Sequence, residues 1–411
     1  MCSDSAWDFA RLMDPVEPPR SIRDLANIHR WSTGSSPRTV SLRSIVDRHR
    51  NAQRITRRLL FYNTFLAPGL ELRIKDFVIN RVLAGIPILG GALESGVQTL
   101  ISALPDGRIR LGAKPALKAR AREIGSVIAN EYDIAALCEV FSEEERRLIS
   151  TYLRRNGEPH IACGPDDSGG FVVATSGLFT ISMDLISRTK KHVFNERGNR
   201  CRDFGAWTNK GVLLAEINLG LPRGKLEVYS THLLAGGGIP SNEERLKIQL
   251  KQVDELIAFV TQVHHPENVM IIVGDFNINA QEESEFTIDG VPGTPISHLS
   301  RKLNAIDMQD VWVLRNRTLG LTANLQADSG ICIPDKTDQR YCDDSPKHQA
   351  SGARIDYVFV ERQKPTHAFL ADFTRPRRVR FERPVNAPDR NKISFMSDHL
   401  GLDITIFATP V

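Results

Sequence analysis

Residues 270–279 read MIIVGDFNIN, a run of apolar residues that ends at Gly274 and is followed by two polar side chains two positions apart. A continuous apolar run of this length is typical of a strand in a sheet that is covered on both faces. Side chains at positions i and i+2 of a strand share a face. We therefore expect Asp275 and Asn277 to lie together at the carboxyl end of a buried strand, where layered α/β folds bind ligands. The alternative is a polar turn that follows a core strand.

Other apolar runs along the chain predict further buried strands. Helical periodicity occurs in only two long segments, 116–132 and 243–260. Several predicted strands follow one another without a helix between them, which excludes a simple alternating nucleotide-binding fold. We expect an α/β fold in which two β-sheets pack face to face with helices outside. The predicted strands cover residues 59–63, 133–141, 177–183, 211–219, 225–233, 270–277, 354–360 and 400–407.

The composition is that of a globular protein, with 411 residues, 41% apolar and 25% charged. The N-terminus has no basic start followed by an apolar core, so we expect no secretory signal. The most apolar long segment, 77–104, is interrupted by Arg81, Pro87 and Glu94, which argues against a transmembrane span. Cys332 and Cys342 are expected to be reduced thiols; the alternative is that they pair across a short loop outside the cytosol. Together these features predict a soluble, cytoplasmic protein, with peripheral attachment to a membrane left open and the oligomeric state undetermined.

Positive charge is concentrated in two segments. Residues 38–58 carry a net charge of +6 and residues 375–392 a net charge of +5, so in a chain of +4 the remainder carries −7. Two basic patches on an acidic body favour a polyanionic partner, either nucleic acid or an anionic membrane surface. The alternative is that these residues form solvated loops and an arginine-rich helix face.

Polar side chains of catalytic or metal-binding type recur near the ends of the predicted strands. Carboxylate and amide oxygens, without a cysteine set or a triple histidine, suit a hard cation such as Mg²⁺, with Mn²⁺ as the alternative. A divalent cation together with a histidine that deprotonates water can hydrolyse a phosphodiester. The residues concerned are Asn63, Glu139, His232, Asp275, Asn277, Asp356, Asp398 and His399.

Eight motifs occur in an order that resembles the endonuclease/exonuclease/phosphatase superfamily over residues 59–411. They are NTF (63–65), LCEVF (137–141), SGLFTIS (176–182), NKGVLLAEI (209–217), STHLLA (230–235), GDFN (274–277), RIDYVFV (354–360) and SDH (397–399). Within the superfamily, several of these segments are most similar to the neutral sphingomyelinases, which are metal-dependent enzymes of the phospholipase C type. The resemblance implies a deoxyribonuclease-like fold, a four-layer α/β sandwich.

The composition of the N-terminal segment and the extent of the resemblance together predict a domain organisation. Residues 1–55 form an N-terminal extension, partly disordered or helical, and residues 56–411 form the catalytic domain. From Asn63 to Glu139 is 76 positions, whereas a β-α-β unit needs about 30. We therefore expect an apolar insertion at about 70–111. It is either a helical hairpin packed on the domain or an element that touches lipid.

For the metal site, the resemblance implies that Glu139 binds Mg²⁺ and that Asn63 lies beside it. Asp398 would lie near the phosphate or bind the metal. Asn209 and Lys210 would face the phosphate as substrate-binding residues.

For the chemistry, the resemblance implies that His399 is the general base and that Asp356 holds it in the required tautomer. Asp275 and Asn277 would orient the phosphate and the attacking water. His232 would donate a hydrogen bond or a proton to the leaving oxygen.

The predicted function is that of a Mg²⁺-dependent phosphodiesterase that hydrolyses a phospholipid head group, sphingomyelin above all, at a membrane surface. The alternative is a Mg²⁺-dependent endonuclease that acts on DNA or RNA and uses the arginine patches. A catalytically silent scaffold would be expected to lack members of the residue set, and this chain retains them all. The loop 323–349 and the basic run TRPRRVRFER (374–383) match no expected role.

Overall fold

The computed structural model describes residues 54–64, 66, 70–73, 108–111, 117–154, 157–165, 175–198, 208–235, 241–316, 318–323, 337–338, 341–342, 352–381, 385–386, 392–393 and 397–411. All of them belong to one compact unit, Gln53–Val411. The predicted N-terminal extension, apart from Arg54 and Ile55, lies outside the described residues. So do most of the predicted 70–111 insertion and most of the loop 323–349.

Every strand and both long helices expected from the sequence are present. The helices are α6 (Leu117–Glu131), α7 (Glu143–Leu153), α8 (Asn242–Val263), α9 (Pro295–Asn304) and α10 (Val311–Arg315). The first strands are β1 (Ile55–Asn63), β2 (Leu70–Arg73), β3 (Arg108–Leu111), β4 (Ile134–Cys138), β5 (His160–Cys163), β6 (Phe179–Ser182), β7 (Ile186–Val193), β8 (Gly211–Ile217), β9 (Leu226–His232) and β10 (Val269–Asp275). The later strands are β11 (Phe286–Ile288), β12 (Val291–Gly293), β13 (Met308–Asp310), β14 (Asp356–Glu361), β15 (Phe369–Phe373), β16 (Arg377–Val379), β17 (Val385–Asn386), β18 (Lys392–Ile393) and β19 (Gly401–Pro410).

Most strands belong to two mixed sheets. The first has the order β15-β19-β1-β4-β6-β5, with β16 also paired to β19, and the second has the order β13-β14-β10-β9-β8-β7. Parallel pairing occurs between β1 and β4 and between β9 and β10. In each parallel pair both carboxyl ends meet at one edge, so polar residues that follow them are brought together.

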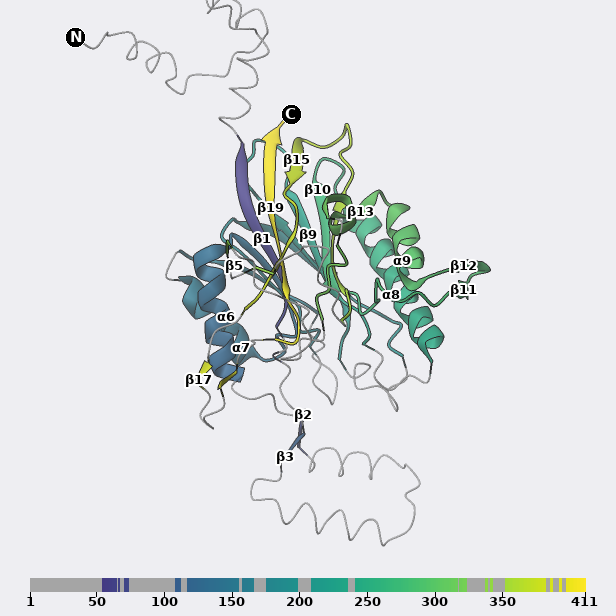
Figure 1. Ribbon diagram of the computed structural model, residues 1–411. Helices are drawn as coiled ribbons and strands as arrows, with labels where there is room; N and C mark the ends of the chain where they lie inside the picture. The colour runs from purple at the N-terminus through teal and green to yellow at the C-terminus, as the bar shows by residue number, and fades with distance from the viewer. Residues whose placement is uncertain are drawn as a thin grey trace, which may run out of the picture. The chain divides into compact units, whose positions relative to one another are not determined.

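Three apolar cores separate four layers (Figure 1). One core lies between the two sheets and takes residues from β1, β4, β8, β9, β10, β14 and β19. A second packs α6 and α7 on the first sheet, and a third packs α8 and α9 on the second sheet. Burial on both faces explains why the central strands read as continuous apolar runs. The predicted four-layer α/β sandwich is confirmed.

The two ends of the predicted insertion lie side by side. β2 and β3 pair antiparallel, with Leu70 opposite Leu111 and Arg73 opposite Arg108. β2 and β3 therefore form one two-stranded ribbon, and residues 74–107 connect the two strands in the sequence.

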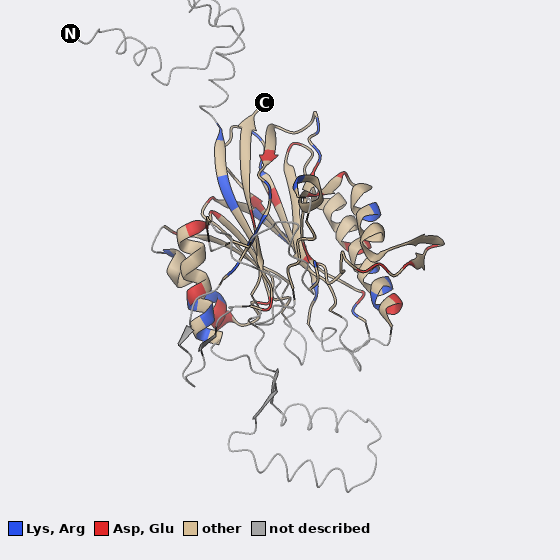
Figure 2. Ribbon diagram, in the orientation of Figure 1, with Lys and Arg blue, Asp and Glu red and all other residues tan. Residues whose placement is uncertain are grey.

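The described arginines of the two basic segments make internal contacts. Arg57 forms an ion pair with Asp184 and Arg58 one with Asp403 at 2.7 Å. Arg378 is buried, and its guanidinium donates to the Leu321 carbonyl at 2.9 Å. Residues of both charges also occur on α6 and α7 (Figure 2). These contacts give the arginines a structural role that a count of charges does not reveal.

Cys342 is disulfide-bonded, so the expectation of a reduced thiol at this position is wrong. Sequence spacing did not decide the question, because pairing depends on how close two cysteines come in the fold. Disulfides persist mainly in oxidising compartments, and the cytoplasmic location stays a prediction. Cys138 and Cys163 are free thiols.

Among the described residues, no helix combines the length and the apolar character that crossing a membrane requires.

Candidate active site

The first sheet contributes Asn63 and Glu139 to the site. β1 and β4 run parallel with Asn63 opposite Cys138, so Glu139, the next residue, leaves the sheet at the same edge. Glu139 has a φ of 62°, in the left-handed backbone region that residues other than glycine and asparagine rarely adopt. Such a conformation costs about 1–3 kcal/mol and is found mainly at functional sites.

The second sheet contributes His232, Asp275 and Asp356. Asp275 lies opposite His232 on the parallel neighbour β9 and opposite Asp356 on the antiparallel neighbour β14. All three are buried, with exposed fractions of 1–3%. Gly274 allows this close pairing, because a Cβ at its position would lie 2.6 Å from the Thr231 carbonyl oxygen.

Asn63 joins the two sheets at the centre of the site. Its Nδ2 donates to Glu139 Oε1 at 3.2 Å and to Asp275 Oδ2 at 3.0 Å, and it lies 3.5 Å from His399 Nε2. Two carboxylates that share one amide donor mark a position where positive charge is stabilised.

His399 and Asp356 form a buried dyad. His399 Nδ1 lies 2.8 Å from Asp356 Oδ2, a distance at which the carboxylate can accept a proton held on Nδ1. Burial disfavours the charged imidazole, but the charge and hydrogen bond of Asp356, aided by Asp275, raise the pKa of His399 to about 10. The imidazole is therefore in its positively charged, doubly protonated form at neutral pH unless a further positive charge is bound nearby.

Asp275 and His232 have environments that favour their neutral forms. Burial, together with the charge of Asp356, raises the pKa of Asp275 to about 7. Burial, then the charges of Lys210 and His399, hold the pKa of His232 well below 6.5. His232 Nε2 lies 3.5 Å from Asp275 Oδ2, while its buried Nδ1 has no hydrogen-bond partner among the described residues.

Asn277 does not continue the alternation of β10. The strand ends at Asp275, and Asn277 has a φ of 52°. Its backbone N–H donates to Asp275 Oδ1 at 2.9 Å, and its side-chain amide donates to the Leu233 carbonyl at 3.1 Å. The two residues do lie together, as expected, but through a turn and not through a shared strand face.

The remaining predicted residues lie around this centre. Asn209 and Lys210 are buried and immediately precede β8, where Gly211 is opposite His232. The charge of Lys210 lowers the pKa of Asp275 and of His232, which places its ammonium group near both. Asp398 is partly exposed and accepts from the Ser397 hydroxyl at 3.4 Å.

Several buried side chains that support the site were not predicted. Gln249 of α8 donates to the carbonyls of Leu234 and Asn277, and so holds the loops after β9 and β10. Arg120 of α6 donates to the Thr64 carbonyl, one residue after Asn63. Polar residues at buried helix positions were the available signal, since such groups need partners.

The donor set fits a divalent cation. Asp275, Asp356 and His399 each offer one ligand atom, and these atoms lie within 4.8 Å of one another. Asp356 Oδ1 is buried and has no hydrogen-bond partner among the described residues. Glu139 adds a further carboxylate, linked to Asp275 through the Asn63 amide that donates to both. Hard oxygen ligands of this kind suit Mg²⁺ or Mn²⁺.

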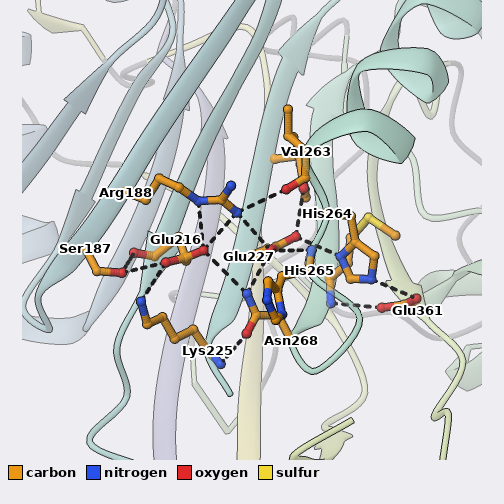
Figure 3. A network of polar contacts seen from close by, with 12 residues as sticks. Ser187, Arg188, Glu216, Lys225, Glu227, Val263, His264, His265, Asn268 and Glu361 are labelled. Carbon is orange, nitrogen blue, oxygen red and sulfur yellow. Dashed lines mark hydrogen bonds and ion pairs between the residues drawn. The ribbon is translucent and has the colours of Figure 1, made fainter. Parts of the chain in front are cut away.

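A second buried polar cluster lies at the opposite end of the second sheet (Figure 3). Glu227 accepts from Tyr229, His264 and Asn268 at 2.7–2.8 Å and pairs with Arg188 at 3.3 Å. Its negative charge is thus matched by donors and a cation already in place. We assign this cluster a structural role.

Comparisons with known proteins agree with the fold. No protein-family model matches the sequence, and no curated protein matches it. Several solved structures do match this chain. A beta toxin from Staphylococcus aureus, a mutant with bound magnesium ions, is 16% identical, with 86% of this chain and 99% of that chain covered and a TM-score of 0.50.

Two further solved structures match over most of their length. Sphingomyelinase C from Streptomyces griseocarneus is 13% identical, with 87% of this chain and 99% of that chain covered and a TM-score of 0.47. An endonuclease/exonuclease/phosphatase family protein from Bacteroides thetaiotaomicron is 12% identical, with 86% and 98% covered and a TM-score of 0.49. The likeness at these identities concerns the fold, and the predicted deoxyribonuclease-like fold is confirmed.

Proposed function

We propose that this protein is a Mg²⁺-dependent phosphodiesterase that hydrolyses a phospholipid head group in the manner of a sphingomyelinase. The observation that carries the proposal is the convergence, at one edge of both sheets, of acids, an amide and two histidines that follow separate strands. Their arrangement joins oxygen donors for a cation to a hydrogen-bonded imidazole. The residues are Asn63, Glu139, His232, Asp275, Asp356 and His399.

Glu139 and Asn63 would hold the cation, with Asp275 beside them. When bound, Mg²⁺ supplies Lewis-acid polarisation of a phosphoryl oxygen and neutralises charge that develops on it. A positive charge beside Asp275 also disfavours the imidazolium form of His399. This matters because His399 must be neutral before it can accept a proton as a general base.

The protein's own residues would do the remaining work. His399, oriented by Asp356, accepts a proton from the attacking water. His232 stays neutral and donates a hydrogen bond toward the leaving oxygen. Asp275 and Asn277, linked to each other by a hydrogen bond, orient the phosphate and the water.

Lys210, with Asn209 before it, would attract the negatively charged phosphate toward this centre. Both residues are buried at the start of β8. Asp398, one residue before His399, would contribute negative charge at the rim of the site.

The motifs that resemble neutral sphingomyelinases support a phospholipid substrate at a membrane surface. An endonuclease is the alternative. Three of the arginines that would contact a nucleic acid backbone, Arg57, Arg58 and Arg378, are engaged in internal contacts. Fewer of these charges are then available to release counterions from nucleic acid, which favours the lipid substrate.

A paired assay tests the proposal. Purified protein with Mg²⁺ is incubated with sphingomyelin vesicles in one arm and supercoiled plasmid in the other. His399→Ala is the inactive variant, and His265→Ala, an exposed histidine at the opposite end of β10, is the matched control. We expect phosphocholine release by the wild type and by His265→Ala, loss of release with EDTA, and none by His399→Ala. Plasmid nicking without lipid turnover would replace the proposal with the endonuclease, and no product in either arm would reject both.

A further inference from the structure

The Asp356–His399 dyad joins two different sheets. Asp356 begins β14 of the second sheet, whereas His399 lies just before β19 of the first sheet. The hydrogen bond between them, 2.8 Å long, therefore depends on how the starts of two strands in separate sheets are held relative to each other. Strand pairing within either sheet does not fix that distance.

One short segment contacts both strand starts. The Thr322 and Ala323 backbone N–H groups donate to the Ala353 carbonyl at 2.9 and 3.0 Å, just before Asp356. The Leu400 N–H donates to the Thr322 carbonyl at 2.7 Å, just after His399. Ala323 also forms isolated bridges with both Ala353 and His399. Residues 321–323 thus lie between the two halves of the dyad.

The Thr322 side chain adds a direct contact with the catalytic segment. Thr322 is fully buried, and its hydroxyl oxygen accepts from the backbone N–H groups of Ile355 and Asp356, each at 3.3 Å. A buried N–H group that loses its acceptor costs about 1–3 kcal/mol unless the backbone moves to find another. The hydroxyl therefore opposes movement of the backbone that carries Asp356.

The basic run that matched no expected role anchors the same segment. Arg378 is buried on β16 and donates to the Leu321 carbonyl at 2.9 Å. β16 pairs with β19 next to His399, with Val379 opposite Gly401. The Cys342 N–H donates to the Arg378 carbonyl at 3.0 Å, so the disulfide-bonded loop is tied to this strand as well.

We propose that residues 321–323 are a strap that sets the geometry of the Asp356–His399 dyad across the two sheets, with Thr322 as its positioning residue and Arg378 as its anchor. This inference rests on the proposed function, because it concerns the same site. In this proposal Thr322 acts through Asp356, whose backbone N–H donates to its hydroxyl oxygen. A displacement of about 1 Å at a catalytic group can cost about 100-fold in rate.

The test uses the full-length protein with Thr322→Val, which keeps the shape and removes the hydroxyl, and Thr322→Ser, which keeps the hydroxyl. We expect Thr322→Val to lower kcat by about 10- to 100-fold with KM changed less than about twofold, and Thr322→Ser to stay near the wild type. In proton NMR, the downfield Nδ1–H resonance of His399, assigned by its loss in His399→Ala, should shift or broaden in Thr322→Val only.

A structural measurement on the wild type completes the test and does not depend on activity. The amides of Ile355 and Asp356 should be protected from hydrogen exchange, and in Thr322→Ser they should remain so. Rapid exchange of both amides in the wild type would overturn the strap, even where Thr322→Val fails to fold. A folded Thr322→Val protein with wild-type kcat and an unchanged His399 resonance would also overturn it. An inactive wild type would reject the proposed function. The strap would then be tested by the NMR and hydrogen-exchange results alone.

Discussion

Replacing Asp356 by Asn tests the dyad directly. The substitution keeps the size of the side chain and removes the charge that faces His399 Nδ1 at 2.8 Å. Both residues are nearly buried, with side-chain exposures of 0% for Asp356 and 9% for His399, so solvent screens their interaction little. The effect should therefore be large.

The magnitude follows from the pKa of His399. Its rise from 6.5 to about 10 corresponds to about 5 kcal/mol in favour of the charged imidazole, since each pKa unit is worth about 1.36 kcal/mol. Burial acts against this rise, and Asp356 is the largest contribution in its favour. Loss of one adjacent opposite charge changes a pKa by about 1–3 units, so the pKa of His399 should fall by that amount in Asp356→Asn.

Catalysis should suffer although the base becomes easier to deprotonate. Without the carboxylate, the imidazole is free to adopt the wrong tautomer and its protonated form is not stabilised during the reaction. Replacement of the carboxylate that orients a catalytic histidine lowers kcat by roughly 10²- to 10⁴-fold, and we expect a loss in this range. KM should change little, because Asp356 acts on the reaction through its hydrogen bond with His399.

The assay combines kcat with an NMR titration of the histidine ring protons. Asp372→Asn is the matched control, because Asp372 is 66% exposed and pairs with Arg315 on the surface. It should leave kcat and the pKa of His399 unchanged. A folded Asp356→Asn protein with wild-type kcat would show that the dyad does not act in catalysis. An unchanged pKa of His399 would refute the electrostatic reasoning.

Three further predictions concern the cation, the second polar cluster and the cysteines. Mg²⁺ should lower the pKa of His399, because a cation beside Asp275 repels the imidazolium; an NMR titration that is the same with and without Mg²⁺ would contradict this placement. Glu227→Gln should destabilise the fold by roughly 3–5 kcal/mol, because it leaves buried partners unmatched, as measured by urea unfolding. Burial alone would raise the pKa of Glu227, but its hydrogen bonds with His264, Asn268 and Tyr229 lower it below 4.5; the stabilisation is therefore present above pH 4.5 and lost as pH falls through the folded-state pKa, and Tm of the variant should depend less on pH in that window. The denatured, unreduced protein should show two fewer reactive thiols than the six cysteines of the chain, because Cys342 is disulfide-bonded; six thiols would disprove the bond.

Some of the site was readable from local patterns. The apolar runs predicted the buried strands, and the polar residues that end them, such as Asn63 and His232, were identifiable because an apolar strand has few reasons to end in a buried amide or imidazole. The order of the motifs then predicted the fold. Each motif is a short stretch of sequence, although their order extends from residue 63 to residue 399.

Other features depend on contacts between distant residues. Asn63 meets Asp275 across 212 positions, and Asp356 meets His399 across 43. Pairing of the strands decides these meetings, and a strand's own sequence does not name its neighbour. The alternation argument placed Asn277 beside Asp275 on one strand, but β10 ends at Asp275, two residues earlier than the pattern implied, and Asn277 has a left-handed backbone.

The sequence by itself determined the fold class, the strand ends and the types of residue that gather there, because hydrophobic patterning and side-chain chemistry are local properties. Only the tertiary structure decided that Thr322 spans the gap between the sheets and that Arg378 anchors it. A buried threonine and an arginine in a basic run look ordinary in sequence. Their role follows from the two strand starts between which the fold places them.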